Sequence, residues 1–544
     1  MAAGGDGFLR RLVRHWLGLV ALMLVLYAGG APSSFGPPNR PSTSAAPPPR
    51  PSPSAPWGSP VKPLASASAA VSSPPPPPPS TPGPPLPRPA PRRAPSTSPL
   101  SCVGTLIQVG TDIQSAINAA PEGTTFCLQA GEYRLTQGIV PKSNDTLVGA
   151  PGTILNGAKL LTSFTQENGD FVASGQTQHN PVVIGECSPV TYTGCQYADA
   201  VFFDDRPLWR VMSLGEVAAG TFYFDYPNGK IYLADNPAGH KVEAAVATRA
   251  FRAFGTGVTG VTIRGLVIEK IANEAQAGAL ESTVWDLENN EVRLNHGVGI
   301  VGGGTIRGNY VHANGQLGIK GGKGTNMLVE NNEMAFNNNA GFDLSWEAGG
   351  GKWFETTGLT VRGNYSHDNH GRGLWTDTDN TSTLYENNRV ENNDGIGILH
   401  EVSFDATIRT NTVTGNGFKE PGGVDGGGIE VMASPNVEIY GNTVSANRDG
   451  IALTQFPRGS GASGPHEINN VYVHNNVIKQ SQGYTGLIQG MGDDSYFTSR
   501  NNRFQANTYY LGANPNCFQW MDAPRTSDQW IAYGEDRTAT FHQL

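Results

Sequence analysis

Charged side chains are scarce in this 544-residue chain, making up 15% of the sequence, where soluble proteins typically have about 25%. Cysteine is also scarce, and none of the spacings between the five cysteines fits a zinc site. The first 100 residues contain nine Lys or Arg and one Asp, so the net charge of −9 leaves −17 for residues 101–544. This acidic remainder argues against a nucleic-acid partner and, more weakly, against a densely anionic polymer.

The composition of the first hundred residues removes them from any packed core. Residues 10–31 pass from a basic start into the apolar run WLGLVALMLVLYAGGA, the pattern of an export signal. No clear A-x-A cleavage site follows, so residues 1–31 are predicted to be a signal peptide or a retained membrane anchor. Residues 32–100 are rich in Pro, Ser and Ala and predict a disordered linker. We therefore expect an extracellular protein, secreted or tethered to the cell envelope, with membrane contact only through this N-terminal segment.

The cysteines are consistent with export. Cys102 and Cys127 flank one compact unit, and Cys187 and Cys195 flank another. In an oxidising compartment these short separations predict two disulfides, with Cys517 left free. The alternative is that each pair consists of unrelated thiols.

From about residue 285 onward an Asn-centred phrase recurs every 19 to 34 residues. The second Asn of each phrase falls at Asn290, Asn309, Asn332, Asn364, Asn388, Asn411, Asn442 and Asn476. This period is too long for a heptad and lacks the helix pairs of helical solenoids, but it suits one coil of short strands. Tight corners favour Asn and Gly, and stacked Asn side chains can bond along the ladder, which gives these asparagines a structural role.

These repeats resemble the right-handed parallel β-helix of the pectin-lyase-like superfamily. The stretch DIQSAINAAPEGTTFCLQAGEYRL at residues 112–135 resembles the N-terminal cap and first coil of that superfamily. The resemblance implies an all-β parallel β-helix over residues 101–544 with an N-terminal capping helix. Residues 197–247 break the repeat, and their alternating strands and PNG turn predict a small antiparallel β insert, which resembles β-helical glycoside hydrolases. The superfamily includes lyases, hydrolases, epimerases and noncatalytic surface proteins, so the fold alone leaves the function open.

Aligning the second strand of each coil on its glycine predicts which side chains share a face. The first and third positions after the glycine point into the core, where His400 is expected to be a hydrogen-bonded core histidine. The second and fourth positions point outward. They form one column with Lys320, Asp343, Trp375, Leu399 and Glu430, and another with Ser345, Asp377, Glu401, Met432 and Thr454. Stacking like charges about 4.8 Å apart costs stability, and such a cost is typical of functional sites.

Three functions fit this carboxylate cluster. The W-x-D … E arrangement resembles the β-helical xylosidases, which implies a retaining glycoside hydrolase with Asp377 as nucleophile and Glu401 as acid/base. This enzyme would act on a poly- or oligosaccharide without a cofactor. The residues expected to bind the substrate are Trp375, Lys320, Asp343, Glu430 and Trp346.

The second function is a calcium-dependent polysaccharide lyase or epimerase that acts on uronates. In that case Asp343, Asp377, Glu401 and Glu430 would bind Ca²⁺ through oxygen ligands, and Lys320 would act as the base. The third is a noncatalytic glycan-binding surface protein. A monomer is expected for each of the three.

Overall fold

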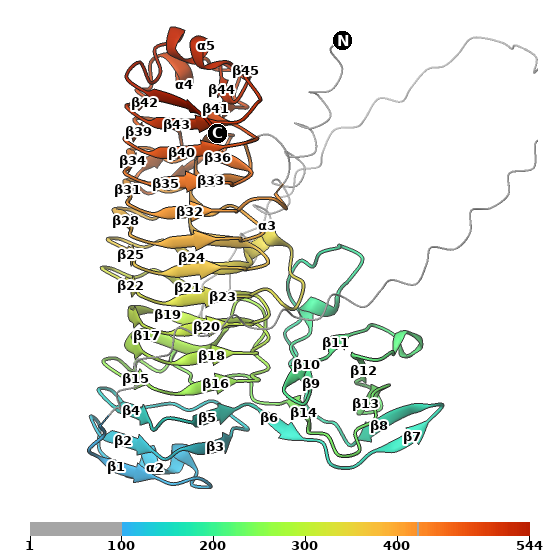
Figure 1. Cartoon of the computed structure of the whole chain (residues 1–544). Helices are drawn as coiled ribbons and strands as arrows, with labels where there is room; N and C mark the ends of the chain where they lie inside the picture. The colour runs from blue at the N-terminus through green and yellow to red at the C-terminus, as the bar shows by residue number, and fades with distance from the viewer. Residues whose placement is uncertain (1–100, 421–423) are drawn as a thin grey trace, which may run out of the picture. The chain divides into compact units, whose positions relative to one another are not determined.

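The computed structural model describes residues 101–420 and 424–544. The predicted signal or anchor over residues 1–31 and the predicted linker over residues 32–100 lie outside the described residues. Within the described ranges, no helix is long and apolar enough to cross a membrane. Coils of short strands stack on one another from β1 (Thr105–Ile107) to β44 (Phe518–Trp520), as Figure 1 shows.

Two extended sheets, almost wholly parallel, form the stack. The larger, 22-stranded sheet contains β1, β2 (Thr125–Leu128), β4 (Thr146–Gly149), β15 (Thr262–Arg264), β17 (Gly278–Glu288), β19 (Val298–Arg307), β21 (Leu317–Gly322), β22 (Leu328–Glu330), β24 (Gly349–Phe354), β25 (Thr360–Arg362), β27 (Arg372–Asp377), β28 (Thr383–Glu386), β30 (Ile398–Glu401), β31 (Ala406–Arg409), β33 (Gly427–Met432), β34 (Val437–Tyr440), β36 (Asp449–Gln455), β39 (Tyr472–His474), β41 (Thr485–Gln489), β42 (Arg503–Gln505), β44 and β45 (Ala523–Arg525).

The second sheet has 13 strands, one from each coil. They are β3 (Gly131–Arg134), β5 (Thr153–Asn156), β16 (Val267–Glu269), β18 (Glu291–Arg293), β20 (Tyr310–His312), β23 (Glu333–Ala335), β26 (Tyr365–His367), β29 (Arg389–Glu391), β32 (Thr412–Thr414), β35 (Thr443–Ser445), β40 (Val477–Gln480), β43 (Thr508–Leu511) and β46 (Thr540–Gln543). The described helices are short: α2 (Ile113–Ala119), α3 (Leu344–Glu347), α4 (Ser495–Thr498) and α5 (Ser527–Ala532).

The Asn ladder explains why the coils turn where they do. Each buried Asn donates from Nδ2 to Oδ1 of its equivalent on the next coil; the Asn388–Asn411 bond, for example, is 2.9 Å long. The residue before the ladder position has a left-handed φ, such as 53° at Asn289 and 64° at Gly363. Such a φ is costly for most residues but not for Gly, and only moderately for Asn. The predicted structural role of these asparagines is confirmed.

The interior is an apolar ladder with one interruption. Ile319 pairs in register with Gly351, which pairs with Leu374, and the ladder continues through Ile398 and Ile429. The four apolar side chains are fully buried in one core cluster. Their predicted stacking along the interior is confirmed.

The predicted burial of His400 is also confirmed. Its Nδ1 lies 2.8 Å from Oγ1 of Thr376 on the preceding coil. Complete burial disfavours the charged imidazolium and lowers the pKa of His400 to about 3. The ring is therefore a neutral core side chain.

Near the N-terminal end, Asp112 caps helix α2 by accepting from the backbone N–H of Ser115 at 2.7 Å. Ile113 and Ile117 on this helix are buried in the main core.

An insert of mainly antiparallel strands separates the early coils from the later ones. It contains a four-stranded sheet with β6 (Ala158–Leu160), β9 (Val201–Phe203), β10 (Arg206–Pro207) and β14 (Val242–Ala245). A five-stranded sheet adds β7 (Thr165–Glu167), β8 (Asp170–Ser174), β11 (Trp209–Arg210), β12 (Thr221–Asp225) and β13 (Lys230–Leu233). The insert has its own apolar cluster and begins at Ala158, well before the predicted start at residue 197.

Candidate functional site

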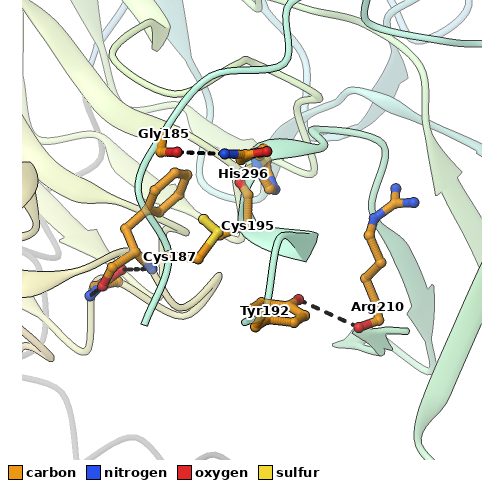
Figure 2. The surroundings of a disulfide bond; sticks show 9 residues. Gly185, Cys187, Tyr192, Cys195, Arg210 and His296 are labelled. Carbon is orange, nitrogen blue, oxygen red and sulfur yellow. Dashed lines mark hydrogen bonds between the residues drawn. A yellow bond between two sulfur atoms is a disulfide. The ribbon is translucent and has the colours of Figure 1, made fainter. Parts of the chain in front are cut away.

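The two disulfides were predicted correctly: Cys102 pairs with Cys127 and Cys187 with Cys195, while Cys517 is free and buried. Figure 2 shows the surroundings of the second bridge, with Tyr192 and His296 beside it. Nε2 of His296 lies 2.9 Å from the carbonyl oxygen of Cys195, which ties the disulfide loop to the β-helix.

The disulfide loop also holds the segment that leads into α3. Cys187 forms a β-bridge with Phe342, and the N–H of Asp343 donates to the carbonyl of Glu186 at 2.8 Å. The Asp343 side chain then caps α3 by accepting from the N–H of Ser345 at 2.9 Å. The prediction that Asp343 and Ser345 lie in the outward columns is therefore wrong. Their coil contributes β24, which begins eight residues further along than the predicted GFDLS strand.

The correct register places a lysine where Asp343 was expected. The first outward column runs through Lys320, Lys352, Trp375, Leu399 and Glu430, which pair in this order on successive coils. Trp375, Leu399 and Met432 form an apolar cluster separate from the main core, which shows that this side of the sheet faces away from the interior.

Asp377 and Glu401 occupy the same outward position on adjacent coils. In the register of β27 on β30, Thr376 pairs with His400, and Asp377 and Glu401 are the next residues of the two strands. Asp377 exposes 7% of its surface and Glu401 1%. The predicted neighbourhood of these two residues is present, but both side chains are far more enclosed than an open groove would leave them.

Asp377 is held by a cation. Nζ of Lys352 lies 2.9 Å from Oδ2 of Asp377, and the Thr378 hydroxyl donates to Oδ1 at 3.1 Å. Burial by itself would raise the pKa of Asp377, but the charges of Lys352 and Arg458 outweigh it and hold that pKa below its usual range.

Lys352 is itself held from the other side by Glu347. The Glu347 carboxylate accepts from Lys352 at 3.0 Å and from Lys320 at 2.8 Å. Although burial opposes its ionisation, these two lysines lower the pKa of Glu347 to about 2. The backbone of Glu347 has a φ of 129°, a strained value for a non-glycine residue, and such strain is common at functional sites. An alternating row of charges thus leads from Lys320 through Glu347 and Lys352 to Asp377.

Glu401 has three partners. Nε1–H of Trp375 donates to Oε2 at 3.0 Å, and Arg458 lies 2.7 Å from Oε1. Nη1 of Arg372 is further away, 3.8 Å from Oε2. Arg458 belongs to a loop after β36 that contains the small hairpin β37 (Ser460–Gly461) and β38 (Gly464–Pro465).

Trp375 is poorly placed to stack on a sugar. Lys352 Nζ lies 3.6 Å from the centre of the Trp375 ring system and Arg372 Cζ lies 4.3 Å from it. The side chain is almost entirely buried. Its clearest role is to orient Glu401. Trp346 stacks on Phe342, with ring centres 5.7 Å apart, in the apolar cluster that contains the Cys187–Cys195 disulfide.

Glu430 is fully buried in the first outward column. Its Oε1 accepts from the Thr454 hydroxyl at 3.0 Å. Burial, reinforced by Asp425 and Glu420, raises the pKa of Glu430 well above its usual range.

The four residues expected to bind calcium do not converge. Asp343 caps α3, Asp377 and Glu401 are paired with cations, and Glu430 lies in the other column. Across residues 101–420 and 424–544, no group of three or more His, Cys, Asp or Glu side chains is arranged to hold a metal ion. The predicted calcium set therefore does not fit the geometry.

Sequence reasoning missed Lys352, Glu347, Arg372 and Arg458. Lys352 had a recognisable signal, because GIKGG around Lys320 aligns with GGKWF around Lys352 as well as it does with GFDLS. Arg458 had none, since it reaches Glu401 across 57 positions of sequence from an irregular loop.

The chain is similar to one protein family and to several solved structures. The family "Right handed beta helix region" matches residues 277–425. A solved structure described as XylC in complex with xylose has a TM-score of 0.58 and 15% identity, over 79% of this chain and 82% of that one. The A-module of the Azotobacter vinelandii mannuronan C-5 epimerase AlgE6 has a TM-score of 0.37 and 13% identity, over 79% and 94%. PfbA, a surface adhesin of Streptococcus pneumoniae, has a TM-score of 0.32 and 10% identity, over 78% and 92%.

No curated protein matches the sequence. The family match and the likeness to XylC establish the fold, and the predicted right-handed parallel β-helix is confirmed.

Proposed function

We propose that this chain is an extracellular retaining glycoside hydrolase acting on a poly- or oligosaccharide, without a cofactor. The observation that carries the proposal is the placement of Asp377 and Glu401 at equivalent outward positions of adjacent coils. Neighbouring strands lie about 4.8 Å apart, and retaining enzymes keep their two carboxyl groups about 5–5.5 Å apart. XylC, which has a similar fold, is described in complex with xylose.

In this mechanism Asp377 is the nucleophile. Lys352 keeps its carboxylate ionised, so that Oδ1 can attack the anomeric carbon while the bond to the leaving-group oxygen breaks. Glu401 gives its proton to that oxygen and later takes one from the water that releases the sugar. To do so, Oε1 of Glu401 must exchange its contact with Arg458 for the leaving group.

One observation favours a second candidate, a noncatalytic glycan-binding protein. Asp377 and Glu401 are both buried and both paired with cations, as expected of structural ion pairs. A structural pair would stabilise the fold, and its neutralisation would not affect any chemistry.

The proposal is tested by screening plant and microbial glycans, with and without EDTA, and then comparing variants on an active substrate. Asp377→Asn should abolish turnover, and Glu401→Gln should slow poor leaving groups by about 10²–10⁴-fold while sparing activated ones. The first product should retain its anomeric configuration. Matched controls are Asp368→Asn and Glu391→Gln, which alter carboxylates in or next to strands of the 13-stranded sheet.

Unchanged hydrolysis in both site variants would refute the assignment. An unsaturated product whose formation stops in EDTA would instead favour the lyase reading. Glycan binding without turnover, unaffected by either substitution, would favour the noncatalytic protein.

A further inference from the structure

One loop reaches from a distant coil to the carboxylate pair. We name it the strap: residues 457–466, which follow β36 and contain the hairpin β37–β38. Arg458 of the strap lies 2.7 Å from Oε1 of Glu401, and Nε2 of His466 lies 2.8 Å from Oδ1 of Asp379, in the turn after β27. The coils follow one another in the order β27, β30, β33 and β36, so the strap extends back along the stack by about 14 Å, at about 4.8 Å per coil.

The strap accounts for the enclosure of the carboxylate pair. Asp377 exposes 7% of its surface and Glu401 1%, although both occupy outward positions of the sheet. Arg458 lies against one carboxylate oxygen of Glu401, and the indole N–H of Trp375 donates to the other. A side chain enclosed in this way cannot meet the glycosidic oxygen of a chain that arrives from solvent. The structure therefore represents a closed state of the candidate site.

Little apolar packing holds the middle of the strap. Its sequence, PRGSGASGPH, contains no Leu, Ile, Val, Met, Phe, Tyr or Trp, and most of its residues are exposed. Gly459 and Gly464 have φ values of 71° and 127°, which glycine adopts readily. Segments with few buried apolar contacts open at a lower free energy than the core does. Opening the strap thus costs mainly the polar contacts of Arg458 and His466.

Both ends of the strap, in contrast, are fixed by one buried side chain. Gln455, the last residue of β36, exposes 1% of its surface. Its Nε2 donates to the carbonyl of Phe456 at 2.8 Å, and its Oε1 accepts from the N–H of Ile468 at 2.6 Å. Ile468 is fully buried in the main core. Fixed ends and a weakly held middle let a loop move without disturbing the strands that carry it.

A cavity of about 230 Å³ lies beside the strap. It is lined by Ser463 and Pro465 of the strap and by Phe404, Asp405, Pro435, Asn436, Glu467 and Asn469. Protein interiors are close-packed and contain few voids larger than a water molecule. The strap can therefore shift on this side without displacing packed side chains.

We propose that the strap is a gate over the carboxylate pair, closed in this structure by the contacts of Arg458 with Glu401 and of His466 with Asp379, and opened when a glycan chain binds. This inference rests on the proposed glycosidase site and adds the step that admits its substrate. In the closed state Arg458 holds Oε1 of Glu401, which faces the leaving group in the proposed mechanism, so the contact is autoinhibitory. His466 is a positioning residue, because its Nδ1 lies 3.3 Å from the carbonyl oxygen of Arg458 while its Nε2 holds the strap to Asp379.

Two substitutions weaken this latch without altering the carboxylate pair. A Cβ on Gly461 would lie 1.7 Å from Oδ1 of Asp379, so Gly461→Ala should push the hairpin away from that side chain. His466→Phe keeps a ring against Phe404, now 5.2 Å away, but removes both nitrogen contacts. Ser460→Ala, at an exposed position of the same hairpin, is the matched control.

Trypsin measures opening of the strap independently of activity. The bond between Arg458 and Gly459 is a trypsin site, and the protease can bind the Arg458 side chain only after it leaves Glu401. The full chain and its variants are incubated with trypsin under native conditions, and the fragment that ends at Arg458 is quantified by mass spectrometry. When opening is fast relative to cleavage, the rate of cleavage follows the fraction of open molecules.

Both latch variants, Gly461→Ala and His466→Phe, should be cut at Arg458 at least about tenfold faster than the wild type, the change expected for the loss of one hydrogen bond to a charged group. Ser460→Ala should be cut at the wild-type rate. Thermal unfolding verifies that each variant is folded. If only open molecules admit a glycan, the apparent affinity is reduced by the open fraction. On an active glycan, the latch variants should therefore lower KM about as many fold as they speed cleavage, with kcat nearly unchanged.

Three results would overturn the inference: the wild type is cut as fast as the latch variants, the latch variants are cut no faster than Ser460→Ala, or faster cleavage leaves KM unchanged. If cleavage responds as expected but no glycan is hydrolysed, the movable strap stands and the proposed hydrolase activity fails. If a glycan is hydrolysed and the latch variants are cut like the control, the hydrolase stands and the gate fails.

Discussion

Replacing Lys352 by methionine is the sharpest perturbation of the candidate site. Met keeps the apolar stem of the side chain but removes the ammonium group that lies 2.9 Å from Asp377 and 3.0 Å from Glu347. Glu347 retains its contact with Lys320, whereas Asp377 loses its direct cationic partner. The substitution therefore leaves one buried carboxylate largely uncompensated.

The size of the effect follows from burial. Breaking a buried ion pair from one side costs about 3–5 kcal/mol, because the remaining charge is left in a poorly solvated place. A cation at hydrogen-bond distance lowers the pKa of an Asp, so Lys352→Met should raise the pKa of Asp377. In the wild type this depressed pKa contributes stability above the unfolded value of about 3.9, and the contribution is lost as the pH falls through the folded pKa. The stability gap between wild type and variant should thus be largest near pH 7 and shrink towards pH 3.

Urea unfolding at pH 7, 5 and 3.5 measures this gap. Lys323→Met is the control, because Lys323 is largely exposed and lies 3.8 Å from Glu355 in a surface pair worth at most about 1 kcal/mol. On an active glycan, the acid limb of the kcat/KM profile should move to higher pH in Lys352→Met, and Lys352→Arg should reverse most of that change. A gap below about 1 kcal/mol at pH 7, or one that does not change with pH, would refute the electrostatic role of Lys352.

Two further predictions concern the scaffold. Asn388→Ala should lower the free energy of unfolding by about 2 kcal/mol or more, because the backbone N–H of Asn364 loses its buried acceptor. In the same urea experiment, the control Asn514→Ala, at an exposed position, should change that free energy by less than about 0.5 kcal/mol. Replacing Cys187 and Cys195 together by serine should cost about 2–3 kcal/mol, since the bridge joins residues that are eight positions apart in the sequence. Unchanged unfolding in reducing and nonreducing buffer would contradict this.

The fold was predictable because each coil repeats the same local requirements. A left-handed corner, a buried ladder Asn and an apolar strand position recur together, and only a few residue types meet the first two. These constraints are local, so they can be read from short phrases without knowledge of the partners in space.

The register failed in a coil where a loop and the short helix α3 precede the strand. Both GFDLS and GGGKWF begin with glycine, and the first has the better apolar pattern. The interior position in β24 is Gly351, and Trp353 fills the space beside it; a Cβ on Gly351 would lie 2.5 Å from that indole. Gly351 therefore holds the ladder position, while the indole of Trp353, two residues later, fills the space that a larger side chain would occupy there. An alignment of strand patterns cannot detect this arrangement.

The electrostatics of the site were misjudged for a related reason. The sequence suggested stacked carboxylates that repel one another, but Lys352 and Arg458 lie against Asp377 and Glu401. Lys352 was hidden by the register error, and Arg458 comes from a loop with no periodic pattern. Long-range ion pairs of this kind depend on the path of irregular segments, which the repeat does not determine.

The two ends of the candidate site differ in whether their buried polar groups have partners within the protein. At Asp377 and Glu401 the charges are compensated by cations, so their arrangement is explained by the protein alone. At Asp425 and Glu430, by contrast, one buried oxygen atom of each side chain has no hydrogen-bond partner among the described residues. Folding alone would have favoured apolar replacements there, since an unpaired buried group is a net cost. Pairing within the protein thus explains the charges at Asp377 and Glu401 but not the unpaired oxygen atoms at Asp425 and Glu430.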